Sequence, residues 1–260
     1  SIVMKEKCPI KERDHMNEIF NDELKKLRGR FMEMGINTSE QIYKATKAFI
    51  DRDVVLAKEV SENDRLINDG ETYLEKHAFK LMNIQRPKES EFRSIMSILK
   101  ASSDLERMAD HASHIARDAI RIKDMDQHWP DIENAIAEMA ETVRHMLEKS
   151  LDAYVYTDEQ TAYSVANMDL EVDKQYVQVH EKIIDQMHAH PELIKDGSHY
   201  ITVIHLLERI GDHIVNLVEW VIYAATGKIT ELNPGKADPE LVNRELQKQA
   251  EEQEKRTSQN

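Results

Sequence analysis

The chain has 260 residues with 7 glycines, 6 prolines and 32% charged residues, a composition typical of long amphipathic helices rather than of a many-stranded sheet. The formal net charge of −14 argues against a nucleic-acid backbone or an anionic membrane surface as a partner and favours cations or a basic protein surface. A single cysteine, Cys8, excludes an internal disulfide framework. The sequence has no signal-peptide pattern and no segment apolar enough to enter a membrane, so we predict a cytoplasmic location. The predicted fold class is all-α.

The first two predicted helices follow from apolar residues that recur at spacings of three and four. The first helix is expected from about Lys11 to Ile50, and Gly35 is a position where it could kink. Asp51 and Asp53 are natural N-caps for the second helix. Pro87 is expected to end that helix, because proline removes a backbone donor and clashes with the preceding turn.

The next three helices are marked by an apolar stripe and by capping residues. The third helix is predicted from a stripe of seven apolar residues: Ile95, Ile98, Leu105, Met108, Ala112, Ile115 and Ala119. Pro130 suits the first position of a fourth helix that runs to about Tyr156. Thr157 or Asp158 is expected to cap a fifth helix that runs to about His188.

The sixth helix contains the most informative stretch of the chain. It is predicted to follow a break marked by Pro191 and Gly197 and to end near Ala225, before Gly227. Its sequence HLLERIGDHIVNLVEW, which starts at His205, has a weaker copy in the third predicted helix, DLERMADHASHIAR. A motif that is written twice indicates an internal duplication.

The spacing of matching residues predicts two tandem three-helix bundles, and therefore six long helices. Asp64 and Asp169 are 105 residues apart, whereas Glu106 and Glu208 are 102 apart, so one loop is about three residues shorter in the second copy. We predict bundles at residues 11–125 and 128–228. Residues 229–260 are rich in charged side chains and are predicted to form a charged tail.

Each copy of the motif carries two acids four residues apart, Glu106 with Asp110 and Glu208 with Asp212. On an α-helix this spacing places both carboxylates on one face with about 6 Å of rise between them. Like charges at that spacing destabilise a helix. Because the same repulsive pair occurs twice, we interpret it as a site for cations.

The second and fifth predicted helices support this interpretation. Asp64 and Asp169 occupy positions of the apolar seam, where an ionised carboxylate is costly unless something neutralises it. Asn68 and Asp173 follow four residues later. The predicted ligand set is therefore the following: Asp64, Asn68, Glu106, Asp110, Asp169, Asp173, Glu208 and Asp212.

Two alternatives remain at this point. The acids of the third and sixth helices could lie on solvated faces, since they stand opposite the apolar stripes, and Arg107 or Arg209 could neutralise the seam acids by ion pairing. Oxygen ligands alone would suit Mg²⁺ or Mn²⁺. Iron or zinc would gain from one of four nearby histidines: His111, His114, His205 or His213.

Together, the LERIGDH motif at 207–213, its partner acids and the duplication resemble the PhoU family over roughly residues 15–230. The resemblance implies a cytoplasmic, usually dimeric, non-enzymatic protein that represses the phosphate-starvation response by linking the ATPase subunit of a phosphate ABC transporter to a sensor histidine kinase. It also implies that the eight predicted ligands hold iron or zinc clusters. The first repeat departs from the family pattern, because Met108 and Ala109 replace Ile-Gly, Asn68 lacks a charge, and His114 stands where the second repeat has Asn216.

Two other functions are compatible with parts of the sequence. A helical accessory protein of a different phosphate or metal transporter fits the same sequence features. A di-metal carboxylate oxidase fits less well, because such sites use Glu-x-x-His pairs and neither Glu106 nor Glu208 has a histidine three residues later.

Overall fold

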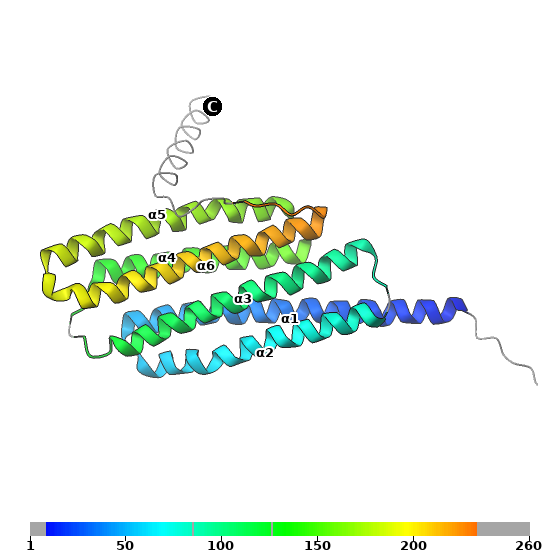
Figure 1. Ribbon diagram of the computed structural model, residues 1–260, viewed down its shortest axis with the longest axis horizontal. Helices are drawn as coiled ribbons and strands as arrows, with labels where there is room; N and C mark the ends of the chain where they lie inside the picture. The colour runs from blue at the N-terminus through cyan, green and yellow to red at the C-terminus, as the bar shows by residue number, and fades with distance from the viewer. Residues whose placement is uncertain (1–8, 85, 126, 233–260) are drawn as a thin grey trace, which may run out of the picture.

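A computed structural model describes residues 9–84, 86–125 and 127–232, which form six long α-helices and one short 3₁₀ turn with no strand among them (Figure 1). The helices are α1 (Pro9–Asp51), α2 (Val54–Ile84), α3 (Glu89–Arg121), α4 (Pro130–Tyr156), α5 (Glu159–Ala189) and α6 (Ile194–Thr226), with the turn at Pro191–Leu193. The predicted all-α fold with six helices is confirmed. Within the described residues, no helix is long and apolar enough to cross a membrane.

Most of the predicted helix boundaries lie at the residues whose chemistry suggested them. Asp53 caps α2, since its Oδ1 accepts hydrogen bonds from the backbone N–H groups of residues 55 and 56 at 2.9 and 3.0 Å. Asp158 caps α5 in the same way. Gly227 ends α6 in the left-handed conformation, with φ of 76°. The alternative caps are wrong: Asp51 is the last residue of α1, and Thr157 is the left-handed residue that ends α4.

The two glycines that the sequence indicates as a kink, Gly35, and as part of a break, Gly197, lie inside helices. Gly35 lies in the middle of the uninterrupted α1, where an added Cβ would be 2.5 Å from Cδ2 of Leu151 on α4. Gly197 belongs to the first turn of α6, where a Cβ would be 2.4 Å from Sδ of Met187. Both glycines therefore permit close contact between elements and do not interrupt a helix.

The helices form two bundles, α1–α3 and α4–α6, that lie side by side with their long axes roughly aligned (Figure 1). The two bundles meet through contacts of α1 with α4 and of α3 with α6. The boundaries predicted for the two domains stay predictions, and residues 233–260 of the predicted tail lie outside the described residues.

The contact between α3 and α6 bears on the alternative that the acids of α6 face water. The predicted seam of α6 is buried, but so are residues on its other sides: Ile204, Leu206, Val215, Val218 and Ile222. A helix covered by its own bundle on one side and by α3 on another has only a narrow exposed strip. The alternative that the acids of α6 lie on a fully solvated face therefore does not hold for Glu208 and Asp212, which are half-buried.

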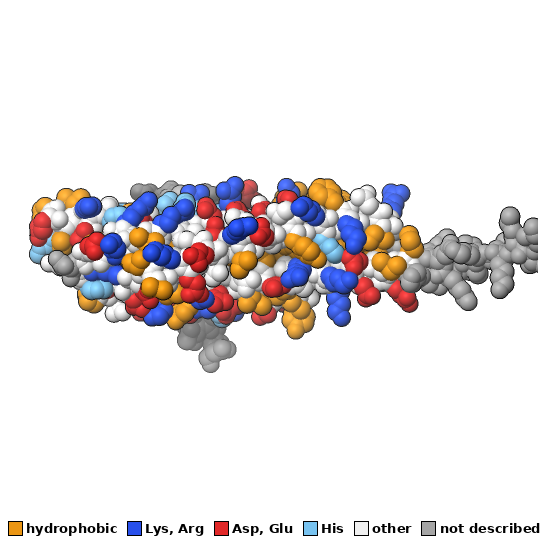
Figure 2. Space-filling view, turned by 90° about the horizontal axis from the view of Figure 1, so that it is seen from below, with side chains coloured by type: hydrophobic (Ala, Val, Ile, Leu, Met, Phe, Trp, Pro, Cys, Tyr) orange, Lys and Arg blue, Asp and Glu red, His pale blue; other side chains and the backbone are white. Residues whose placement is uncertain are grey.

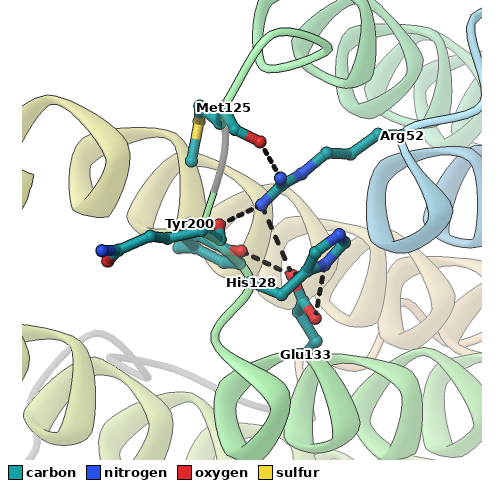
Figure 3. A network of polar contacts seen from close by, with 6 residues as sticks. Arg52, Met125, His128, Glu133 and Tyr200 are labelled. Carbon is teal, nitrogen blue, oxygen red and sulfur yellow. Dashed lines mark hydrogen bonds and ion pairs between the residues drawn. The ribbon is translucent and has the colours of Figure 1, made fainter.

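A polar network joins the bundles at one end (Figure 3). Arg52, between α1 and α2, has a left-handed backbone with φ of 55° and donates a hydrogen bond to the carbonyl oxygen of Met125 in the linker. Its guanidinium lies 4.0 Å from Glu133 of α4, and both side chains are more than nine-tenths buried. Glu133 also accepts a 2.7 Å hydrogen bond from the Tyr200 hydroxyl and lies 2.9 Å from Nδ1 of His128.

Candidate metal centre

The four acids predicted in the second repeat lie on the facing helices α5 and α6. Asp169 and Asp173 belong to α5 and are buried, with exposed fractions of 1% and 5%. Glu208 and Asp212 belong to α6 and are half-buried. The structure thus brings the predicted acids together between two helices, and we call Asp169, Asp173, Glu208 and Asp212 the second cluster.

Gly211 explains how a carboxylate fits between these helices. A Cβ at this position would lie 2.6 Å from Oδ1 of Asp169 and 3.5 Å from Cγ1 of Val172. The Asp169 carboxylate therefore occupies the space that the side chain of any other residue at position 211 would fill. The glycine of the LERIGDH motif is needed for this approach of α5 to α6.

Burial and mutual repulsion oppose ionisation of the second cluster. Burial, and then the charge of Asp212, raise the pKa of Asp173 to about 7. The pKa of Glu208 is raised to about 7 by burial and by the charges of Asp212 and Asp173. Burial also raises the pKa of Asp212. A bound cation would reverse this repulsion.

An unsatisfied carboxylate oxygen is a second reason, independent of net charge, why the second cluster suits a cation. Oδ2 of Asp173 is buried and accepts no hydrogen bond from the described residues. The Arg209 side chain is exposed, and although its charge lowers the pKa of Glu208 and Asp212, burial outweighs it. The four carboxylates suit hard cations such as Mg²⁺ or Mn²⁺, and also iron, and a histidine nitrogen is close by, since Nδ1 of His205 lies 3.7 Å from Oε2 of Glu208.

The matching residues of the first repeat, between α2 and α3, are less enclosed. Asp64 is half-buried and Asn68 is exposed, while Glu106 and Asp110 of α3 are half-buried. Ala109, fully buried, stands where the second repeat has Gly211. Ala109 therefore carries a methyl group at the repeat position where Gly211 has no side chain. The seam prediction of a deeply buried acid is confirmed for Asp169, whereas Asp64 is only half-buried, although its Oδ1 is buried and has no hydrogen-bond partner among the described residues.

One acid of the first cluster was missed by the sequence reasoning. Burial raises the pKa of Glu106, and Glu71 contributes the next largest effect, ahead of Asp110 and Asp64. Burial likewise raises the pKa of Glu71, which lies on α2 one turn after Asn68. Counting 105 residues along the chain places Tyr176 at the equivalent position, so the duplicated pattern did not point to an acid. We use first cluster for Asp64, Asn68, Glu71, Glu106 and Asp110.

Histidines distinguish the first cluster further. Ligand atoms of Asp110, His111 and His114 all lie within 4.8 Å of one another. His111 is only 6% exposed, and neither of its ring nitrogens has a hydrogen-bond partner in the described part of the chain. Its burial lowers its pKa to about 4, which keeps the ring neutral and able to bind a metal. This set of donors suits iron or zinc better than Mg²⁺.

The predicted arginine alternative is observed only weakly in the first cluster. Nε of Arg107 lies 3.8 Å from Oε2 of Glu106, and 64% of the Arg107 side chain is exposed. Water screens such a pair, which contributes little to stability.

At the interface with the other bundle, His213 and Asn216 of α6 contact Oδ1 of Asp104 on α3 at 2.9 and 3.3 Å. These contacts hold the α6 face that carries Asp212 against α3.

Two three-helix bundles that repeat one acidic motif between their second and third helices define a duplicated helical-bundle protein with two candidate metal clusters. Residues 31–119 and 136–221 each match the sequence model of the PhoU domain. The chain belongs to the PhoU family.

Relatives and solved structures agree with this assignment. The chain is 34% identical over 213 residues to a phosphate-specific transport system accessory protein PhoU homolog of Pseudomonas aeruginosa, covering 82% of this chain and 88% of that one. The Streptococcus pneumoniae homolog of the same description is 32% identical over 84% of this chain and its own full length. The crystal structure of PhoU from Pseudomonas aeruginosa has a TM-score of 0.76, at 34% identity, over 80% of this chain and 100% of that chain. A crystal structure of the phosphate transport system regulatory protein PhoU from Streptococcus pneumoniae has a TM-score of 0.72, at 29% identity, over 82% of this chain and 99% of that one.

Proposed function

We propose that the protein is a non-enzymatic regulator of phosphate uptake that couples the ATPase subunit of a phosphate ABC transporter to a sensor histidine kinase and so represses the phosphate-starvation response. The observation that carries the proposal is membership of the PhoU family through both repeats, with relatives described as phosphate-specific transport system accessory proteins. Cytoplasmic location and assembly as a homodimer are part of the proposal. On the face below α2, acidic, basic and apolar side chains are mixed, which suits a protein contact better than a nucleic-acid backbone (Figure 2).

The two clusters are proposed to bind metal ions with different preferences. A metal ion in the second cluster would neutralise Asp169, Asp173, Glu208 and Asp212, which the structure places between α5 and α6. The chain itself supplies the site, since Gly211 admits the Asp169 carboxylate and the α3 contacts hold α6 in place. The first cluster is proposed to take iron or zinc through Asp110, His111 and His114, together with its acids.

The regulatory proposal is tested in a strain that lacks the gene. A reporter of phosphate-starvation genes should stay active in phosphate-rich medium after deletion, and the wild-type gene should restore repression. Normal repression in the deletion strain would contradict the proposal and favour an accessory role for a different transporter. Sedimentation of the purified chain tests the homodimer, and a monomer at all concentrations would refute that part.

The metal proposal is tested by removing and restoring the ion. Metal-free protein should melt at a lower temperature than metal-loaded protein, because binding to the folded state alone stabilises it by linkage. Asp169→Asn with Asp212→Asn should remove most of the response to metal that belongs to the second cluster. Asp64→Asn with Asp110→Asn is the matched control and should leave the metal response of the second cluster intact. If chelator does not shift the melting temperature of the wild type, and Arg209→Met alone destabilises it, the acids are neutralised by arginine and the metal proposal fails.

A further inference from the structure

A cavity of about 320 Å³ lies between the two bundles, away from both clusters. It is bounded by α1, the first turns of α3 and the last residues of α4 and α6. Its walls are largely apolar and include Phe31, Met32, Ile98 and Val221. No residue of the first or second cluster lines it. The volume is within the range of cavities that bind small molecules.

The inner end of the cavity is polar but already satisfied. The Tyr154 hydroxyl lies 2.9 Å from Oγ of Ser97, which donates a 2.7 Å hydrogen bond to the carbonyl oxygen of Trp220. Burial holds the pKa of Tyr154 well above its usual value, so the phenol stays neutral. The Tyr154 ring packs against Phe31 with 4.7 Å between ring centroids. The inner end therefore offers a ligand apolar contact and no site for a charge.

Two cations stand at the mouth of this cavity. Lys25 and Arg28 are exposed residues of α1 that line it, and neither forms an ion pair with a carboxylate of the described residues. Arg28 donates a 3.0 Å hydrogen bond to Oγ of Ser94, a neutral partner. The adjacent cations behave differently: Lys26 lies 2.7 Å from Glu23, and Arg30 lies 2.8 Å from Glu33. In a chain with a net charge of −14, the two cations at the cavity mouth are thus left available for an anion.

One residue that lines the cavity is a glycine without close neighbours. Gly29 lies in the middle of α1, where glycine weakens a helix, and lines the cavity. An added Cβ would have no other atom within 4 Å, apart from the local helix backbone. Nothing in the fold therefore requires glycine at this position. A larger side chain would project into free space beside Lys25 and Arg28.

We propose that this cavity binds a small amphipathic anion, a medium-chain carboxylate, with its alkyl chain among Phe31, Met32 and Val221 and its carboxylate at Lys25 and Arg28. The apolar walls match the alkyl chain, and the two cations match the head group. The site is independent of the metal clusters and does not depend on the proposed regulatory function. It would give the contact between the bundles a ligand that holds α1, α3, α4 and α6 together.

Calorimetric titration of the full chain with octanoate tests the proposal, with the neutral octanamide as a matched ligand. We expect one saturable site for octanoate and weaker binding of octanamide, by about tenfold, since a hydrogen bond to a charged group is typically worth that much. Labelled methionine methyl groups locate the site by NMR, and the Met32 signal should shift. No saturable octanoate binding, or equal binding of the two ligands, would overturn the proposal.

Three variants locate the binding to this cavity. Gly29→Leu should fill the cavity and abolish octanoate binding while the melting temperature is kept or raised. Lys25→Gln with Arg28→Gln should weaken octanoate about tenfold and leave octanamide unchanged. Lys26→Gln with Arg30→Gln removes the same charge next to the cavity and should bind octanoate as the wild type does. Wild-type affinity in Gly29→Leu, or equal losses in the two double variants, would refute the assignment.

Discussion

Replacing Gly211 by alanine tests the role of close helix contact in the second cluster. The new Cβ would lie 2.6 Å from Oδ1 of Asp169, so either α6 moves away from α5 or the carboxylate leaves its position. Overpacking of this kind costs about 1–3 kcal/mol. Alanine also favours a helix over glycine by about 1 kcal/mol, which offsets part of the cost.

The matched control is Gly29→Ala, where the added Cβ meets no atom outside the local helix. Both variants gain the same helix propensity, so the difference between them isolates the clash, and we expect Gly211→Ala to be less stable than Gly29→Ala by about 1–3 kcal/mol. In a chain of this size the difference corresponds to roughly 2–10 °C in melting temperature. Thermal melting measured by circular dichroism, with and without metal, is the assay. If Gly211→Ala gains as much stability as Gly29→Ala and keeps its response to metal, Asp169 does not depend on the glycine and the reasoning is wrong.

Two further predictions concern buried charges. Arg52→Met should lower the free energy of unfolding by about 3 kcal/mol in urea denaturation, because Glu133 would stay buried without the Arg52 guanidinium. Adding Glu133→Gln should recover part of this loss. A change below about 1 kcal/mol for Arg52→Met would show that the pair is unimportant. Metal-free protein should lose stability as pH rises from 5 to 8, because the pKa values of Asp173 and Glu208 are raised to about 7 from ordinary values of 3.8 and 4.5, so that the folded state holds protons that the unfolded state has released. The stabilisation from these two groups is complete below their ordinary pKa values and is lost as pH passes through about 7. A melting temperature of the metal-free protein that rises between about pH 5 and 8, or that is unaffected by Asp173→Asn, would contradict the raised pKa values of Asp173 and Glu208.

The local features of the fold followed from the sequence because they depend on neighbouring residues. Asp53, Pro130 and Gly227 mark helix ends through capping, a missing donor and a left-handed backbone, and each acts within one turn. The period of the apolar residues shows which stripe of each helix is buried. The position of Asp169 in that stripe predicted that this acid faces a partner helix, and Asp169 is buried.

Features that depend on contacts between distant segments could not be derived in this way. Periodicity shows that a helix has a buried side, but it does not show that α3 covers another side of α6. For that reason the sequence left open whether Glu208 and Asp212 lie on a solvated face. The same limit applies to Glu71, whose relation to Glu106 comes from the packing of α2 on α3. A duplicated pattern also hides such a residue when its copy, here Tyr176, has different chemistry.

The sequence by itself determined the all-α class, the six helices, the duplication and eight candidate ligands, because helix periodicity, capping and repeat spacing all depend on the order of residues along the chain. Only the tertiary structure decided how deeply each acid is buried, since Asp169 lies against Gly211 of the facing helix whereas Asp64 is only half-buried. It alone placed Arg52 against Glu133 and left the cavity between the bundles beside Lys25 and Arg28. Burial, repulsion between charges and empty space all depend on which surfaces meet, and that is set by the packing of helices far apart in the chain.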